Sequence, residues 1–217
     1  MRQLPSDKYN VAWFKLAEFV VRGEKERALG LYRLLVHSFD DRALAFQLEG
    51  DLLLSFNDAQ TAKEKYVCAA EAYKLVGRYI EAAAVYEHLH TLSPEQEEYS
   101  FILLALYQQL NFSIRLGMTF KQICELYLKK NQVDRVIALL DQYEPLIEMN
   151  QKAEIYSLIT LDLVKHKKSV DQIEMFLSQT VDFLMLSSDA QQMPNFLMQL
   201  DALDANHYKK ALQFIKG

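Results

Sequence analysis

Glycine and proline are scarce in this sequence, which has only 6 Gly and 4 Pro among its 217 residues. Average usage is about 12% for the two together, or roughly 26 residues in a chain of this length. Because β-sandwiches and barrels need a turn every ~8–12 residues, the shortage disfavours both architectures. Collagen-like and low-complexity chains are excluded as well. The hydrophobic content of 51% argues against disorder, since it is enough to build a core.

Other signals are also missing. No apolar run reaches the ~18 residues of a membrane span, so we expect no membrane insertion. The segment Met1–Tyr9 lacks the basic-then-apolar layout of a secretory signal, which predicts a cytoplasmic protein. The net charge is −5 and neither half of the chain is strongly basic, so we expect no nucleic-acid partner.

Residues that carry catalytic or metal chemistry are few. Cys68 and Cys124 have no CxxC spacing and lie in helical patterns, so we expect both to be reduced and buried. His88 and His90 form the only close histidine pair, but on a helix they point about 200° apart and cannot hold one metal ion. Phosphate-binding and nucleophile-elbow motifs are lacking. We therefore expect no enzyme activity, no cofactor and no metal.

The apolar residues instead recur at intervals of three and four, which is typical of successive amphipathic helices. Turn residues stand at the breaks, namely Gly23, Asn57, Gly77, Asn131 and Asn150. Ser93-Pro94 has the form of a helix start, and the Ser/Thr-x-x-Gln capping pattern recurs at Thr119, Ser169 and Ser188. The sequence predicts an all-α chain of eleven or twelve helices, over about 6–21, 24–37, 40–55, 58–75, 78–91, 94–115, 119–129, 132–147, 151–165 and 169–186, with one or two more to the C-terminus.

A short motif repeats near the N-terminus. Ala28-x-x-x-Tyr32 follows a turn residue, and Ala62-x-x-x-Tyr66 follows another turn residue 34 residues later. The small side chain lets one helix approach its hairpin partner closely, and the aromatic one turn further on fills the space beside it. The repeat therefore favours stacked helix hairpins.

With these residues the chain resembles the tetratricopeptide repeat (TPR) family. A unit beginning at Ala43 matches the family's pattern at Phe46, Gly50, Leu53, Ala62, Tyr66 and Ala69, and a unit beginning at Lys63 matches at Tyr66, Ala70, Tyr73, Ala82, Tyr86 and Pro94. A first unit fits around 10–42, and a weaker one begins near Gly117. The resemblance implies one right-handed α-solenoid domain over 1–217, with the clearest repeats in 10–96, weaker ones in 97–150 and divergent helices in 151–217.

The two best units overlap in the helix expected over 58–75, which leaves two alternatives open. Either the array changes phase there, or an Ala- and Tyr-rich helix matches both patterns by composition. In the resembling family the first helix of each unit lines a concave groove. The corresponding positions give a candidate binding groove of eight residues: Lys15, Phe19, Arg22, Gln47, Asp51, Leu54, Lys121 and Glu125.

We therefore expect a non-catalytic scaffold that binds a peptide or a partner helix of another protein in this groove. One alternative is a cytosolic chaperone or assembly factor for a specific client, and a remote one is a helical-repeat enzyme. Aromatic residues at repeat-like spacing are expected to fill the space between helices and not to form a binding surface. The apolar C-terminal segment is expected either to cap the array or to give a homo-oligomer.

Overall fold

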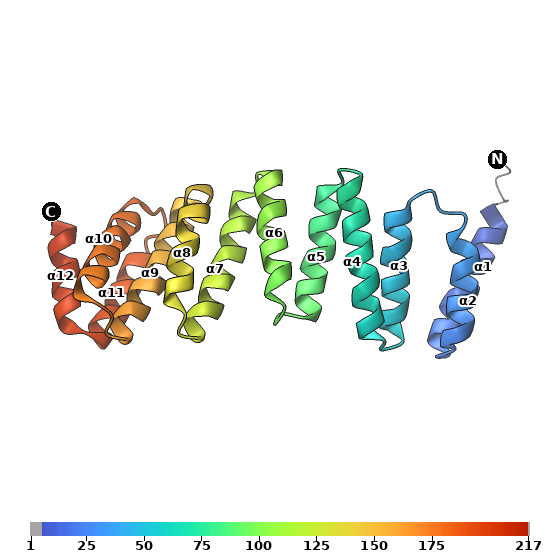
Figure 1. Ribbon diagram of the computed structural model, residues 1–217, viewed down its shortest axis with the longest axis horizontal. Helices are drawn as coiled ribbons and strands as arrows, with labels where there is room; N and C mark the ends of the chain where they lie inside the picture. The colour runs from blue at the N-terminus through green and yellow to red at the C-terminus, as the bar shows by residue number, and fades with distance from the viewer. Residues whose placement is uncertain (1–5, 217) are drawn as a thin grey trace. The chain divides into compact units, whose positions relative to one another are not determined.

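A computed structural model describes the backbone of residues 6–216 and the side chains of residues 11–216. Over this range it contains twelve α-helices and no strand, which confirms the prediction of an all-helical chain (Figure 1). The helices are α1 Ser6–Val21, α2 Lys25–Val36, α3 Arg42–Ser55, α4 Ala59–Leu75, α5 Tyr79–Leu92, α6 Glu97–Leu110, α7 Ser113–Lys129, α8 Val133–Tyr143, α9 Met149–Lys165, α10 Val170–Leu186, α11 Gln192–Leu203 and α12 Ala205–Lys216. A 3₁₀ turn over Glu144–Leu146 follows α8.

Four of the predicted breaks are formed by residues with a left-handed backbone. The φ angles are 71° at Gly23, 60° at Asn57, 76° at Gly77 and 56° at Asn131. Glycine and asparagine adopt this conformation at the least cost, and a helix that reaches it ends there. The breaks predicted at these four positions are therefore confirmed.

The predicted helix over 94–115 is wrong. The chain breaks at Asn111, whose φ is 55°, and α7 starts at Ser113. Gly117, which lies between the helices expected over 94–115 and 119–129, and Thr119, which was expected at a helix start, are both buried inside α7. Gly117 serves close packing there, because a Cβ atom added to it would lie 2.0 Å from Oε1 of Gln151.

Several predicted helix starts are also wrong. Ser93 does not cap α6 but ends α5, where it is buried and its hydroxyl accepts a hydrogen bond from Nζ of Lys63 at 3.0 Å. Ser188 lies four residues before α11, and Asn150 lies within the first turn of α9 and not at a break. Ser169 does cap its helix, since its Oγ accepts from the backbone N–H of Gln172 at 3.4 Å.

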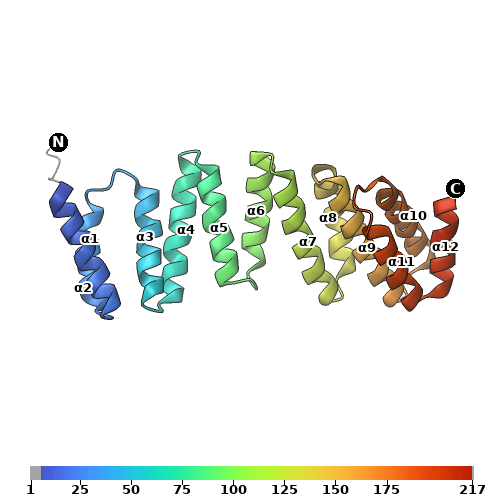
Figure 2. The same cartoon turned by 180° about the vertical axis from the view of Figure 1, so that it is seen from behind.

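The chain divides into two compact units, Met1–Tyr99 and Ser100–Gly217. In the first unit α4 packs against both α3 and α5 (Figure 2). The hydroxyl of Tyr66 in α4 donates to Asp51 in α3 at 2.6 Å, and that of Tyr86 in α5 donates to Glu71 in α4 at 2.5 Å. Both pairs span 15 residues. Helix α4 therefore takes part in a tyrosine–carboxylate contact with the helix before it and in another with the helix after it.

In the second unit the helices pack as hairpins whose first members touch one another. Helix α7 contacts α8 and α9, α9 contacts α10 and α11, and α11 contacts α12. Helix α10 also packs on α12. The first helices α7, α9 and α11 of three successive hairpins are thus neighbours, with α10 and α12 in a second layer.

The core contains the tyrosines that the sequence placed between helices. Six of them are buried, which confirms their packing role, namely Tyr32, Tyr66, Tyr73, Tyr86, Tyr107 and Tyr127. Trp13 and Tyr99, for which the same role was expected, are half-buried, and the side chain of Tyr9 lies outside the described residues. Of the two cysteines, Cys124 is buried as predicted, whereas the prediction for Cys68 is wrong because it is exposed on α4. No helix within residues 6–216 is both long enough and apolar enough to span a bilayer.

Candidate functional site

A groove runs along α7, α9 and α11 in the second unit. It consists of a larger hollow of about 740 Å³ and a smaller one of about 340 Å³. Both are lined by Glu125 of α7, Leu158 and Leu161 of α9, and Gln199 of α11, so they form one continuous surface. We call this surface the α7/α9/α11 groove.

Helical periodicity explains why these side chains share the groove. On α7 the lining residues Lys121, Glu125 and Leu128 are four and three residues apart. On α9 the same spacing relates Leu158 and Leu161 to Glu154. Residues three and four apart lie on one face of an α-helix. The opposite face of each helix enters the core, as shown by the buried Tyr127, Ile155 and Ile159 and their neighbours.

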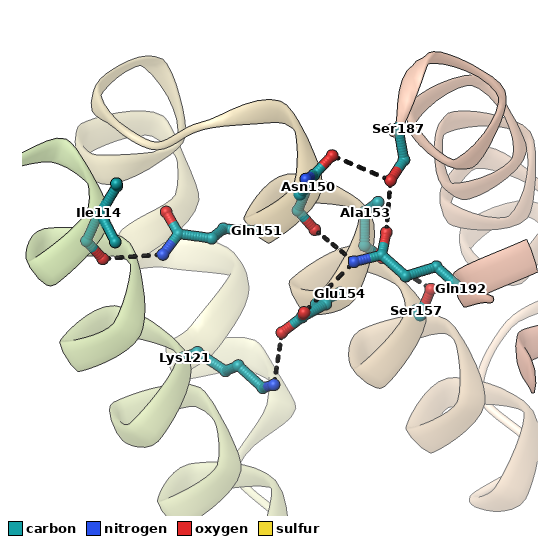
Figure 3. Close-up of polar contacts among 9 residues, drawn as sticks. All are labelled: Ile114, Lys121, Asn150, Gln151, Ala153, Glu154, Ser157, Ser187 and Gln192. Carbon is teal, nitrogen blue, oxygen red and sulfur yellow. Dashed lines mark hydrogen bonds and ion pairs between the residues drawn. The ribbon is translucent and has the colours of Figure 1, made fainter. Parts of the chain in front are cut away.

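One end of the groove is fixed by an ion pair between α7 and α9. Nζ of Lys121 pairs with Oε2 of Glu154, and both side chains are about one third exposed, at 35% and 36%. Nε2 of Gln192, at the start of α11, donates to Oε1 of the same Glu154 at 3.2 Å. Figure 3 shows the three side chains converging from α7, α9 and α11. This contact joins all three helices that form the groove.

The segment before α11 is held against α9 by further hydrogen bonds. Oγ of Ser187 lies 3.0 Å from Oδ1 of Asn150 and 2.8 Å from Oε1 of Gln192, and it can donate its one proton to either oxygen. Nε2 of Gln192 also donates to the backbone oxygen of Asn150 at 3.2 Å (Figure 3). The backbone N–H of Ser188 donates to Oδ1 of Asn150 at 2.9 Å. Asn150 and Ser188 therefore have a positioning role that their predicted roles at helix ends did not include.

The distance between α7 and α9 is set at Gly117. Nε2 of Gln151 on α9 donates to the backbone oxygen of Ile114 on α7 at 2.7 Å (Figure 3). Oε1 of the same amide lies against Gly117 and is buried without a hydrogen-bond partner. A larger residue at 117 would displace this amide, so glycine is what permits the contact.

Charge is unevenly distributed in the groove. Glu125 is half-buried and has no ion-pair partner among the residues that the structure describes. Asp162, whose side chain is 11% exposed, faces Nδ1 of His166 at 3.2 Å, and this contact is an ion pair only when the histidine is protonated. Lys129 and Lys165 line the same hollow but are exposed. In the larger hollow the carboxylates of Glu125 and Asp162 are therefore more buried than the ammonium groups of Lys129 and Lys165.

Of the eight residues predicted for a binding groove, Lys121 and Glu125 line this one. The other six belong to the first unit. There Gln47 and Asp51 accept hydrogen bonds from Tyr73, at 3.0 Å, and from Tyr66. Asp51 is exposed, while Gln47 and Leu54 are half-buried.

The remaining three predicted residues lie on α1. Lys15 is exposed, and Arg22 pairs with Glu18 at 2.5 Å. The ring of Phe19 lies 4.6 Å from the guanidinium carbon of Arg27. Arg22 and Phe19 are therefore engaged by neighbours in the α1/α2 hairpin.

The first unit has its own hollow, of about 720 Å³, between the start of α3 and the end of α4. Phe46, Cys68, Leu75 and Arg78 are among its lining residues, and none of the six predicted residues of this unit lines it. Arg78 is engaged by Asp41 and Glu81 and is not free to bind a charged group. The hollow offers an apolar surface with one exposed thiol.

Sequence reasoning missed the contributions of α9 and α11. Leu158, Leu161 and Gln199 lie beyond residue 150, where the repeat pattern fades. A signal for this part of the groove was present in the sequence. Along 154–165, apolar and polar residues alternate at intervals of three and four, which indicates a helix face that is neither fully buried nor fully polar.

Within the described part of the chain, no group of three or more His, Cys, Asp and Glu residues could hold a metal ion. No model of a known protein family matches the sequence, and no curated protein is significantly similar to it.

Proposed function

We propose that this protein is a non-catalytic interaction scaffold that binds a peptide or a partner helix of another protein in the α7/α9/α11 groove. The observation that carries the proposal is the continuity of the groove across the first helices of three successive hairpins. A surface of this kind presents a row of side chains to an elongated ligand.

The packing of the helices supports a fold proposal as well. We infer a right-handed α-solenoid plan like that of the TPR family, in which first helices line the inner face and second helices the outer one. The contacts of α7 with α9 and of α9 with α11, together with those of α10 with α12, are the neighbours that this plan requires. The Ala and Tyr residues that match the TPR pattern in the sequence also support this proposal.

The chemistry of the groove suits a peptide. The floor of the groove is apolar and consists of Leu128, Leu158, Leu161 and the partly exposed Leu203. Polar side chains such as Asn195 and Gln199 stand beside it and can bond to a peptide backbone. An apolar centre with a polar rim is the usual composition of an interface that binds and releases its partner.

The test is a selection of peptides on the full chain. The immobilised protein is panned against a phage-displayed library of random peptides of about 16 residues, long enough to follow three helices spaced ~8–10 Å apart. We expect a family of related sequences to be enriched. Their affinity is then measured by fluorescence anisotropy with wild type and two variants.

The variants are Leu161→Gln in the groove and Met185→Gln as its control. Leu161 lines both hollows, whereas Met185 is 57% exposed on α10 and lines neither. We expect Leu161→Gln to weaken binding about tenfold, since an apolar anchor of this size is worth ~1.5 kcal/mol or more. Met185→Gln is expected to leave it unchanged. Failure to enrich any peptide family, or equal binding by both variants, would refute the proposal.

A further inference from the structure

We infer that the α7/α9/α11 groove selects peptides in which a lysine or arginine lies close to a large apolar side chain, with the cation pairing with Glu125. This inference rests on the proposed function and names the chemistry of its ligand. It begins from the position of Glu125, which lines both hollows and so lies where they meet.

Glu125 is the acidic group on the groove face of α7 and α9 whose charge is least compensated. The other glutamate at this level, Glu154, is paired with Lys121 and accepts a hydrogen bond from Gln192. Lys121 is one turn before Glu125 on α7 and is already engaged by that ion pair. A half-buried carboxylate without a partner is an unfavourable arrangement, and a ligand cation relieves it.

Asp162 extends the negative surface into the larger hollow. It shares that hollow with Glu125, and its side chain is 11% exposed. Its partner His166 contributes a compensating charge only when protonated. Two carboxylates therefore line the larger hollow.

The two lysines that line the same hollow offset only part of the negative charge of Glu125 and Asp162. Lys129 and Lys165 are exposed, and each is the last residue of its helix. An exposed ammonium group on a long side chain is strongly hydrated and mobile. An acidic peptide could bind these lysines only by bringing its own carboxylates beside Glu125 and Asp162, which repulsion disfavours.

The apolar part of the ligand is specified by the floor of the groove. Leu158 and Leu161 lie on α9 opposite Glu125 and line both hollows with it. An aliphatic or aromatic side chain that packs on these leucines brings the adjacent residues of a peptide within reach of the Glu125 carboxylate. The combination of a cation and an apolar anchor follows from this arrangement.

The experiment extends the peptide selection described above. We expect the enriched sequences to carry Lys or Arg within about four residues of Leu, Ile, Met or Phe, more often than the unselected library does. The strongest binder is then synthesised together with a version in which that basic residue is replaced by glutamine. Both peptides are measured against wild type, Glu125→Gln and the matched control Glu64→Gln. Glu64 is an exposed glutamate of α4, outside the groove.

With wild type and with Glu64→Gln, loss of the basic residue is expected to weaken binding about fivefold, which is the upper end for a partly exposed ion pair. With Glu125→Gln the same change is expected to cost less than twofold, because the partner charge is already gone. This non-additivity separates a direct pairing from a structural effect of Glu125 on the groove.

Two other results have distinct meanings. If peptides are enriched and lost with Leu161→Gln, but carry no basic residue or show additive effects with Glu125→Gln, the inference is overturned and the proposed function stands. If no peptide family is enriched on the wild-type protein, the proposed function fails and the inference fails with it.

Discussion

The close contact between Gly50 and Tyr66 allows a quantitative prediction about stability. Gly50 is buried in α3, and a Cβ atom added to it would lie 2.8 Å from Cε1 and 2.9 Å from Cδ1 of the Tyr66 ring. That ring is 2% exposed, its hydroxyl is bound to Asp51, and the ring of His88 lies against it with centroids 4.8 Å apart. The tyrosine is therefore held on several sides and cannot move away at low cost.

Gly30 is a matched control within the same unit. It is also in the interior of a helix, α2, but a Cβ atom there would meet nothing within 4 Å. Alanine is favoured over glycine inside a helix by ~1 kcal/mol, so Gly30→Ala is expected to stabilise the protein by about that amount. Gly50→Ala gains the same term but also incurs an overpacking cost of ~1–3 kcal/mol. The difference between the two variants is therefore expected to be ~1–3 kcal/mol, with Gly50→Ala the less stable.

The assay is urea unfolding followed by far-ultraviolet circular dichroism, with midpoints and slopes compared between the variants and wild type. Equal slopes would show that the two variants differ in stability and not in the compactness of their unfolded states. A Gly50→Ala protein as stable as Gly30→Ala would refute the reasoning, since it would mean that Tyr66 moves aside freely.

Two further predictions concern titration and thiol reactivity. The backbone N–H of Leu44, assisted by Arg78, holds the pKa of the Asp41 carboxyl below its usual value of ~3.9, so its stabilising effect is complete above about pH 4 and is lost as the pH falls through the lowered pKa. We expect Asp41→Asn to flatten the loss of unfolding free energy measured below about pH 4, and an unchanged acid profile would contradict this. Burial raises the pKa of the Cys124 thiol to about 12, whereas Cys68 is exposed. Titration with a thiol reagent should therefore show one fast-reacting group in the folded protein, absent in Cys68→Ser, and a second only after denaturation; two fast groups would contradict the buried position of Cys124.

The helices themselves were largely predictable because their signals are local. Gly23, Asn57 and Gly77 end helices through their own backbone preferences, and Ser169 caps one through its own side chain. The errors arose where one residue type serves two purposes. Ser93 matched a capping pattern but serves as a buried hydrogen-bond acceptor for Lys63, a partner 30 residues away. No local pattern could reveal that partner.

The groove, too, was predictable only where local signals define it. Lys121 and Glu125 were predicted from their place in a repeat, whereas Leu158, Leu161 and Gln199 were not, because their part of the groove depends on how α9 and α11 pack beside α7. Cys68 was expected to be buried because it lies in a helical pattern without CxxC spacing, but it is exposed, whereas its neighbours Ala69 and Ala70 are buried. A helix with small residues on more than one face does not define its own buried side.

The sequence by itself determined that the chain is helical and where most of its helices end, because hydrophobic period and backbone preference act within a few residues. It also placed the tyrosines between helices, since a large aromatic after a small residue requires a neighbour to cover it. The tertiary structure alone decided that α4 has a tyrosine–carboxylate contact on each side. It also decided that Lys121 pairs with Glu154, whereas Glu125 has no ion-pair partner among the residues that the structure describes. Those facts depend on contacts between residues far apart in the chain, and only packing brings such residues together.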